Sequence, residues 1–387
     1  MRYYKAAIVF IFIMTLMISG CRVENSSTSQ NVSVPNISFS DFKIEQREDI
    51  LLSDPIHIPF DQVPGSPKSI MASYEDKLLI ESFGNQEMYY YEYNFTTKKC
   101  VPIGSTPLLE LGSGSFVMTD SNEVITSFAF EGKKKNTLIK INTEKKRIDQ
   151  LEHFDWWPPF QYYALVDQDT LLMFGPKLLA SHGEEKYSYY IDRYSLSKKS
   201  YRTLIDIPDS SKQGVSCFYY ANQRIYTYQF DVESNTVNYY IQSYTLDGKR
   251  AERYDMNECI PEGDTVSDLI VFENYFFLWT LNGSFIILQH DSASQKIQMI
   301  ETDTHVTFKQ SPKMVLNNFG CLYDRKDHIL MRYDHANHCF VKQKVNLDKD
   351  DVFQNFWINE NGTIIICIAN ETNPDNQERY FVVSALS

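Results

Sequence analysis

The chain has 387 residues, of which 43% are hydrophobic and 14% aromatic, and its formal net charge at pH 7 is −13. This composition allows a large buried core and excludes an intrinsically disordered chain. The acidic balance disfavours nucleic acid and anionic lipid headgroups as partners, because like charges repel.

The first residues, MRYYKAAIVFIFIMTLMISGC, have the pattern of a lipoprotein signal peptide. Arg2 and Lys5 precede an apolar run over residues 6–18, which is too short to span a bilayer as a helix. The run ends in Ile-Ser-Gly-Cys, which resembles the lipobox of bacterial lipoproteins. The resemblance implies cleavage before Cys21 and acylation of that cysteine. A plain secretory signal with a chance cysteine is the alternative.

We therefore expect a signal peptide over residues 1–20, a flexible tether over 21–37 and a folded domain over 38–387. The tether is rich in Ser and Asn, so it cannot bury enough apolar surface to offset the entropy lost on ordering. The expected location is a bacterial cell envelope, at the outer membrane or a periplasm-facing membrane surface. The N-terminal lipid would hold the protein there.

The folded part has the composition of β-structure, with 26 Tyr and 25 Phe against 15 Gly and no convincing amphipathic helix after the signal. Its cysteines show no CxxC spacing, which argues against a zinc ribbon or a redox pair. We predict no metal and no cofactor, and no disulfide follows from the positions of Cys100, Cys217, Cys259, Cys321, Cys339 and Cys367.

Six short segments align without gaps and indicate a repeat. They are YNFTTKKC (93–100), INTEKKRI (141–148), YSLSKKSY (194–201), YTLDGKRA (244–251), HDSASQKI (290–297) and YDHANHCF (333–340). Each joins the end of an apolar strand to another strand through a polar turn. Counted at the second residue, the steps are 48, 53, 50, 46 and 43 residues. Units of this length built only from strands are typical of β-propeller blades.

The two ends of the chain complete the count. Three strands follow the sixth repeat, in FQNFWINENG, TIIICIAN and ERYFVVSALS, and residues 37–46 form an unassigned strand-like segment. We predict an all-β propeller of four-stranded antiparallel blades, with seven blades and six as the alternative. Pairing of the N-terminal strand with the C-terminal blade would close the ring and remove its exposed sheet edges.

With the lipobox and the repeat, the chain resembles the lipid-anchored β-propellers of bacterial envelopes, including the TolB-like and six-bladed propeller lipoprotein families. LLELGSGSF (108–116) loosely matches the Gly-rich loop of those families but lacks its Pro-Gly-Glu core. The resemblance implies a binding or scaffolding role with no assigned activity.

The stretch YDHANHC (333–339) has the ligand types of a zinc site, in Asp334, His335, His338 and Cys339. Its place in the repeat argues against that interpretation. His335 and His338 occupy the columns that hold Phe95 and Lys98 in the first copy. We therefore predict an exposed hairpin turn.

HFDWWPPFQYY (153–163) is the predicted ligand-binding segment. It links blades two and three, and Trp156, Trp157 and Phe160 would stack on a sugar or contact a partner if exposed. Burial of the tryptophans between the two blades is the alternative. A second candidate is residues 175–186, GPKLLASHGEEK, interpreted as a mobile insertion.

No local motif supports nucleophilic catalysis, since the chain contains no G-x-S-x-G, H-E-x-x-H or P-loop. We expect a lipid-anchored binding or scaffold propeller that recognises a protein or a glycan through loops on one face. The alternative is a propeller hydrolase acting on polysaccharide, with two carboxylates at the central channel.

Overall fold

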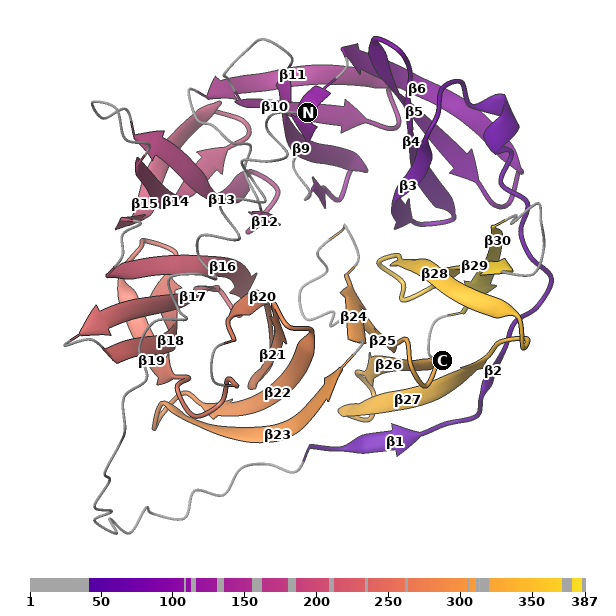
Figure 1. Ribbon diagram of the computed structural model, residues 1–387. Helices are drawn as coiled ribbons and strands as arrows, with labels where there is room; N and C mark the ends of the chain where they lie inside the picture. Colours follow the sequence, from indigo (N-terminus) through magenta and orange to yellow (C-terminus); the bar gives the residue numbers. More distant parts are fainter. Residues whose placement is uncertain are drawn as a thin grey trace.

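Seven β-sheets stand around a common axis in the computed structural model, and each sheet is one blade of a propeller (Figure 1). The structure describes residues 42–384 apart from 108, 113–115, 131–135, 155–161, 180–185, 209–211, 234–235, 262–263, 305, 311–312, 314–319 and 371–377. The seven-bladed propeller is confirmed. Among these residues the one helical element is the 3₁₀ turn η1 (Phe60–Gln62), and no helix is long and apolar enough to cross a membrane.

Blades one to four follow the N-terminal segment in chain order. Blade one consists of β3 (Lys68–Tyr74), β4 (Lys77–Phe83), β5 (Glu87–Asn94) and β6 (Lys99–Pro107). Blade two has a divided inner strand and consists of β7 (Leu109–Gly112), β8 (Val117–Met118), β9 (Glu123–Phe130), β10 (Asn136–Asn142) and β11 (Arg147–Phe154). Blade three consists of β12 (Tyr162–Leu165), β13 (Thr170–Leu179), β14 (Lys186–Ser195) and β15 (Ser200–Pro208). Blade four consists of β16 (Gln213–Ala221), β17 (Arg224–Glu233), β18 (Thr236–Thr245) and β19 (Arg250–Asp255).

Blades five to seven complete the ring. Blade five consists of β20 (Val266–Phe272), β21 (Tyr275–Thr280), β22 (Ser284–Asp291) and β23 (Lys296–Thr304). Blade six consists of β24 (Val306–Lys309), β25 (Cys321–Asp324), β26 (Ile329–Asp334) and β27 (Cys339–Asn346). Blade seven has the three strands β28 (Asp351–Ile358), β29 (Ile364–Asn370) and β30 (Arg379–Val383).

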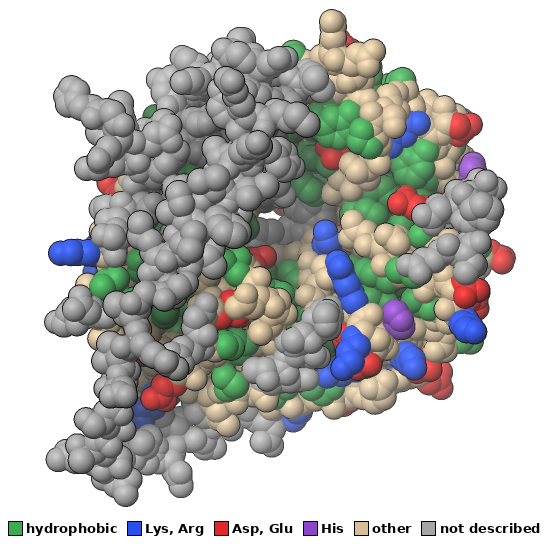
Figure 2. All heavy atoms as spheres, viewed as in Figure 1, with side chains coloured by type: hydrophobic (Ala, Val, Ile, Leu, Met, Phe, Trp, Pro, Cys, Tyr) green, Lys and Arg blue, Asp and Glu red, His purple; other side chains and the backbone are tan. Residues whose placement is uncertain are grey.

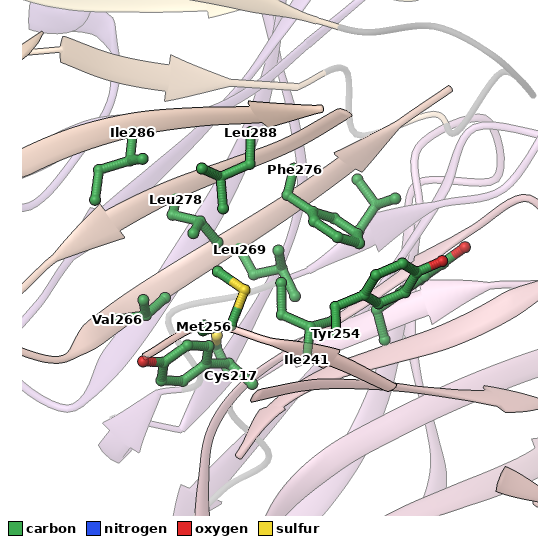
Figure 3. Packing of buried hydrophobic residues seen from close by; sticks show 13 residues of the cluster. Cys217, Ile241, Tyr254, Met256, Val266, Leu269, Phe276, Leu278, Ile286 and Leu288 are labelled. Carbon is green, nitrogen blue, oxygen red and sulfur yellow. The ribbon is translucent and has the colours of Figure 1, made fainter. Parts of the chain in front are cut away.

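The core lies between neighbouring blades, because both faces of each sheet are covered and the middle strands are apolar on both sides. Figure 3 shows the cluster between blades four and five, where Tyr254 and Ile241 of one sheet meet Phe276 and Leu278 of the next. Burying a large apolar side chain contributes about 1.5–3 kcal/mol. The blade-to-blade contacts therefore carry most of the stability of the ring.

The repeated segments form four-residue turns between the third and fourth strands of blades one to six. The residue before each turn accepts a hydrogen bond from a backbone N–H inside it, as Asn94 does from Thr97 at 2.7 Å and Asn142 does from Lys145 at 2.7 Å. The last turn residue is left-handed in five of the six copies: Lys98, Lys146, Lys199, Gln295 and His338. In blade four this role passes to Gly248.

The stretch YDHANHC is confirmed as the sixth of these turns. Asp334 ends β26, and its Oδ1 accepts hydrogen bonds from the N–H groups of Ala336 and Asn337. His335 and His338 are exposed, and Cys339 is buried at the start of β27. Within the described part of the chain, no group of three or more His, Cys, Asp or Glu side chains is arranged to hold a metal ion.

The N-terminal segment closes the ring, but the pairing differs from the one expected for residues 37–46. β1 (Ile44–Gln46) and β2 (Ile50–Leu51) pair in parallel with β27, the outer strand of blade six. The contact with the C-terminal blade comes later, at Ile56, whose N–H donates to the Tyr380 carbonyl at 2.7 Å. The expectation of closure is therefore confirmed and the closing residue is corrected. The segment runs along the rim of blade six before it reaches blade seven (Figure 1).

The prediction of a mobile insertion over residues 175–186 is wrong at both of its ends. β13 covers residues 175–179 and β14 begins at Lys186, and the two strands pair as far as Leu179 opposite Lys186. The expected Gly-rich loop over 108–116 is likewise strand from Leu109 to Gly112.

All six cysteines beyond residue 21 are free thiols.

Candidate functional site

A cavity of about 400 Å³ lies at the centre of the ring, where the inner strands of the blades converge. All seven blades contribute to its lining: Ile70, Met71, Ala72, Ser73, Phe116, Val117, Tyr162, Tyr163, Ala164, Phe218, Tyr219, Tyr220, Asp268, Ile270, Phe308, Lys309, Gln310, Asn355, Trp357 and Ile358. Figure 2 shows the hollow at the centre of the ring, with Lys or Arg side chains along one side of it. Its volume and aromatic walls are those of a small-molecule site.

β-Bulges in the inner strands bring polar side chains into this apolar lining. Ser267 has no opposite residue in the ladder with β21, because Val266 pairs with Thr280 and Asp268 pairs with Trp279. The Ser267 hydroxyl instead donates a 3.1 Å hydrogen bond to the Trp279 carbonyl. An extra residue of this kind reverses the alternation of side chains beyond it, and bulges are frequent beside functional sites. β28 carries the same irregularity before Asn355.

Asp268 and Asn355 follow their bulges and have the same local geometry. Oδ1 of each accepts a hydrogen bond of 2.9 Å from the next backbone N–H, that of Leu269 or of Phe356. This bond gives the backbone N–H beside the bulge a hydrogen-bond partner. The same bond fixes each side chain and leaves its second polar atom, Oδ2 of Asp268 or Nδ2 of Asn355, for interactions in the cavity.

Asp268 is the one carboxylate among the described residues that line the cavity. Burial raises the pKa of this carboxyl to about 6, although the hydrogen bond from Leu269 acts in the opposite direction. No described Lys, Arg or His forms an ion pair with it. A carboxylate held without a cation inside an aromatic cavity is a candidate functional group.

Lys309 ends β24 on the neighbouring blade and also lines the cavity. Burial lowers the pKa of its ammonium group, and repulsion from Arg325 adds to the effect. No described carboxylate lies within ion-pair distance of it. The cavity therefore contains one acid and one base that are paired neither with each other nor with another described residue.

Two tyrosines lie close to Asp268. Burial raises the pKa of both Tyr162 and Tyr219, and the negative charge of Asp268 contributes to the shift in each. The Tyr219 hydroxyl donates a 3.0 Å hydrogen bond to Oε1 of Gln310. This bond links blades four and six across the cavity wall and fixes the Gln310 side chain.

A polar network joins four blades at the connections that follow their inner strands. Lys313 forms ion pairs with Glu360 at 3.1 Å and Glu75 at 3.5 Å, and its backbone makes a parallel bridge with Met118. The Glu75 carboxylate also accepts a 2.9 Å hydrogen bond from the side chain of Asn122. These contacts join blades six, seven, one and two.

The predicted site residues lie outside the described residues. These are Cys21, the expected lipid attachment site, and the aromatic residues Trp156, Trp157 and Phe160. The chain on either side of the aromatic residues is strand, since β11 ends at Phe154 and β12 begins at Tyr162. The segment thus links blades two and three, as predicted.

The sequence reasoning missed Asp268 and Lys309, although a signal was present. Asp268 interrupts an otherwise apolar strand, VSDLIVF, and Asn355 interrupts VFQNFWI in the same way. An alignment of the inner strands across the blades would have placed Asp268 and Asn355 in one column with Ala72 and Cys217. Ala72 and Cys217 each also follow a bulge.

No protein-family model matches this chain, and no curated protein sequence matches it. Among solved structures, an oligogalacturonate lyase in complex with manganese has a TM-score of 0.51 at 9% identity, covering 81% of this chain and 86% of its own. An oligogalacturonate lyase from Vibrio parahaemolyticus has a TM-score of 0.50 at 10% identity, covering 80% and 88% of the two chains. A periplasmic gluconolactonase from Pseudomonas aeruginosa gives 0.48 at 11% identity, covering 80% and 96%. The likeness is one of fold.

Proposed function

We propose that this chain is a lipid-anchored envelope protein that binds a small polar ligand in the central cavity of its propeller. The observation that carries the proposal is the pair Asp268 and Lys309, which line an aromatic cavity and form no ion pair with any residue that the structure describes. Desolvating charged groups costs free energy unless a partner compensates it, and a bound ligand would supply that partner. The resemblance to lipid-anchored propellers agrees with a binding role.

Binding is favoured over hydrolysis of a polysaccharide by the composition of the cavity. A glycosidase needs two carboxyl groups about 5–10 Å apart, one on each side of the scissile bond. The described lining has Asp268 alone, with a lysine and two amides as the other strongly polar groups. A protein or glycan partner at the segment that carries Trp156 and Trp157 stays a separate prediction.

The anchor is tested by replacing Cys21 with serine. We expect the wild-type protein to fractionate with membranes and to incorporate labelled palmitate, and Cys21→Ser to lose both properties, because the thiol that accepts the lipid is gone. A Cys100→Ser variant is the matched control and should behave like the wild type. Membrane fractionation of Cys21→Ser without label would show that another element anchors the chain.

The cavity is tested by filling it. Met71 lines the cavity and Met299 lies exposed on the rim, so Met71→Trp and Met299→Trp make the same change in the two environments. Full-length protein is isolated from its native membranes, and the small molecules released on denaturation are identified by mass spectrometry. We expect a stoichiometric ligand from the wild type and Met299→Trp, and at least tenfold less from Met71→Trp. Equal release from all three proteins contradicts the proposal, and so does a wild-type protein that neither releases a small molecule nor binds one added in solution.

A further inference from the structure

Asp268 and Lys309, which are partly buried, differ from the buried acids that this protein pairs with cations. The Asp351 side chain is 4% exposed and forms an ion pair with Arg379. Glu92 is paired with Lys146 at 2.8 Å and with Lys77 at 3.6 Å. These two acids thus have a cation beside them, whereas Asp264, which is 6% exposed, accepts hydrogen bonds from the backbone N–H groups of Thr265 and Asn282. Among the described residues, Asp268 has no cation beside it and accepts the single backbone hydrogen bond from Leu269.

An apolar or amide side chain at either position would avoid the free-energy cost of taking a charged group out of water. Two neighbouring blades instead contribute one charge each, of opposite sign, to the same cavity. The bulge before Asp268 and its hydrogen bond from Leu269 hold the carboxylate in a defined orientation. Fixed charges are the means by which a site selects a ligand of complementary charge.

The possible ligands differ in which of the two charges, that of Asp268 or that of Lys309, they would leave without an opposite charge beside it. A neutral sugar would contact the aromatic walls but leave both charges without a partner. A simple cation would compensate Asp268 alone, and a simple anion would compensate Lys309 alone. A molecule with both charges compensates both residues, and an ammonium group is also favoured near the faces of aromatic rings. Tyr162, Phe218 and Trp357 would in addition cover an apolar group.

We infer that the central cavity takes a zwitterion, a free α-amino acid or a short peptide, with its ammonium group at Asp268 and its carboxylate at Lys309. This inference rests on the proposed function, because it names the ligand class of the same cavity. Asn355 and Gln310 also line the cavity, and their side-chain amides can hydrogen-bond a carboxylate or a peptide amide of such a ligand.

The test uses the full-length lipidated protein in detergent and isothermal titration calorimetry. The zwitterionic probes are L-phenylalanine, glycyl-L-phenylalanine and glycylglycyl-L-phenylalanine, which differ in the separation of their charges. Each is compared with its N-acetylated form, which lacks the cation, and its C-terminal amide, which lacks the anion. D-Glucose is the neutral probe. We expect one zwitterion to bind about 10- to 100-fold more tightly than either of its single-charge forms, the range for one charged hydrogen bond.

Two variants test which residue binds which charged group of the ligand. Asp268→Asn should weaken binding of the zwitterion and the amide about 10- to 100-fold and leave the N-acetylated form unchanged. Lys309→Gln should weaken the zwitterion and the N-acetylated form and leave the amide unchanged. Melting temperatures close to that of the wild type show that both variants are folded.

The outcomes separate this inference from the proposed function. If the small molecule released from native protein is neutral, or if glucose binds and no zwitterion does, the zwitterion inference is overturned while the proposed function stands. The inference also fails if the two variants do not discriminate between the single-charge probes. If wild-type protein carries no small molecule and binds no probe, both proposals fail.

Discussion

Lowering the pH from about 7 to below 4 is expected to reduce the free energy of unfolding by about 3 kcal/mol through His290 alone. His290 lies in β22, is 4% exposed, and its ring stacks on Phe276 with the centroids 4.2 Å apart. Burial lowers its pKa from 6.5 to about 4, although the carboxylates of Glu252 and Asp291 favour the charged form.

The direction of this pH dependence follows from proton binding. Between pH about 6.5 and about 4 the unfolded chain binds a proton at His290 that the folded protein does not bind. Stability therefore falls as the pH falls through this window, and the loss is complete below the folded pKa. At about 1.4 kcal/mol for each unit of pKa difference, the total is about 3 kcal/mol.

Urea unfolding of the wild type and of His290→Phe at a series of pH values measures this contribution. Phenylalanine keeps an aromatic ring against Phe276 and Tyr254 but does not titrate, so the stability of this variant should fall less on acidification. Other groups titrate in both proteins, and the difference between the two curves isolates His290. His338→Gln is the control, because this histidine is exposed and glutamine occupies the same turn position at Gln295. Parallel curves for wild type and His290→Phe would contradict the prediction.

Replacing Ile58 with alanine is expected to lower the free energy of unfolding by about 2–4 kcal/mol, the usual cost of deleting a buried branched side chain. Ile58 is 5% exposed and packs with Ile70 of blade one and Ile365 of blade seven. The next residue back, His57, accepts a 2.9 Å hydrogen bond from the Tyr93 hydroxyl through its carbonyl. The N-terminal segment thus fills the junction where the ring closes.

Urea unfolding gives the size of this effect, and amide hydrogen exchange gives its location. We expect faster exchange in β3 and in β28–β30, the strands on the two sides of the junction, with blade four unchanged. Ile44→Ala is the matched control, because Ile44 belongs to the same segment but is 39% exposed, so its replacement should cost well under 1 kcal/mol. A uniform rise in exchange around the ring would show that Ile58 does not act at the junction.

The number and boundaries of the blades follow from the sequence because hairpin chemistry is local. A polar side chain such as Asn94, Asn142 or Asp334 bonds to the backbone two or three residues later, so each turn is encoded within eight residues. The same locality explains why YDHANHC could be recognised as a turn from its position among the repeats.

The closing contact and the cavity could not be obtained in this way, because both depend on residues far apart in the chain. Ile56 meets Tyr380 only when the ring is complete, and the strands at 44–46 and 50–51 find their partner nearly 300 residues later. Asp268 and Lys309 look like isolated polar residues within their own strands. Only the convergence of the inner strands places them in one cavity, where removal from water shifts both pKa values. Local hydrogen bonding thus determined the repeat, and long-range packing decided the site.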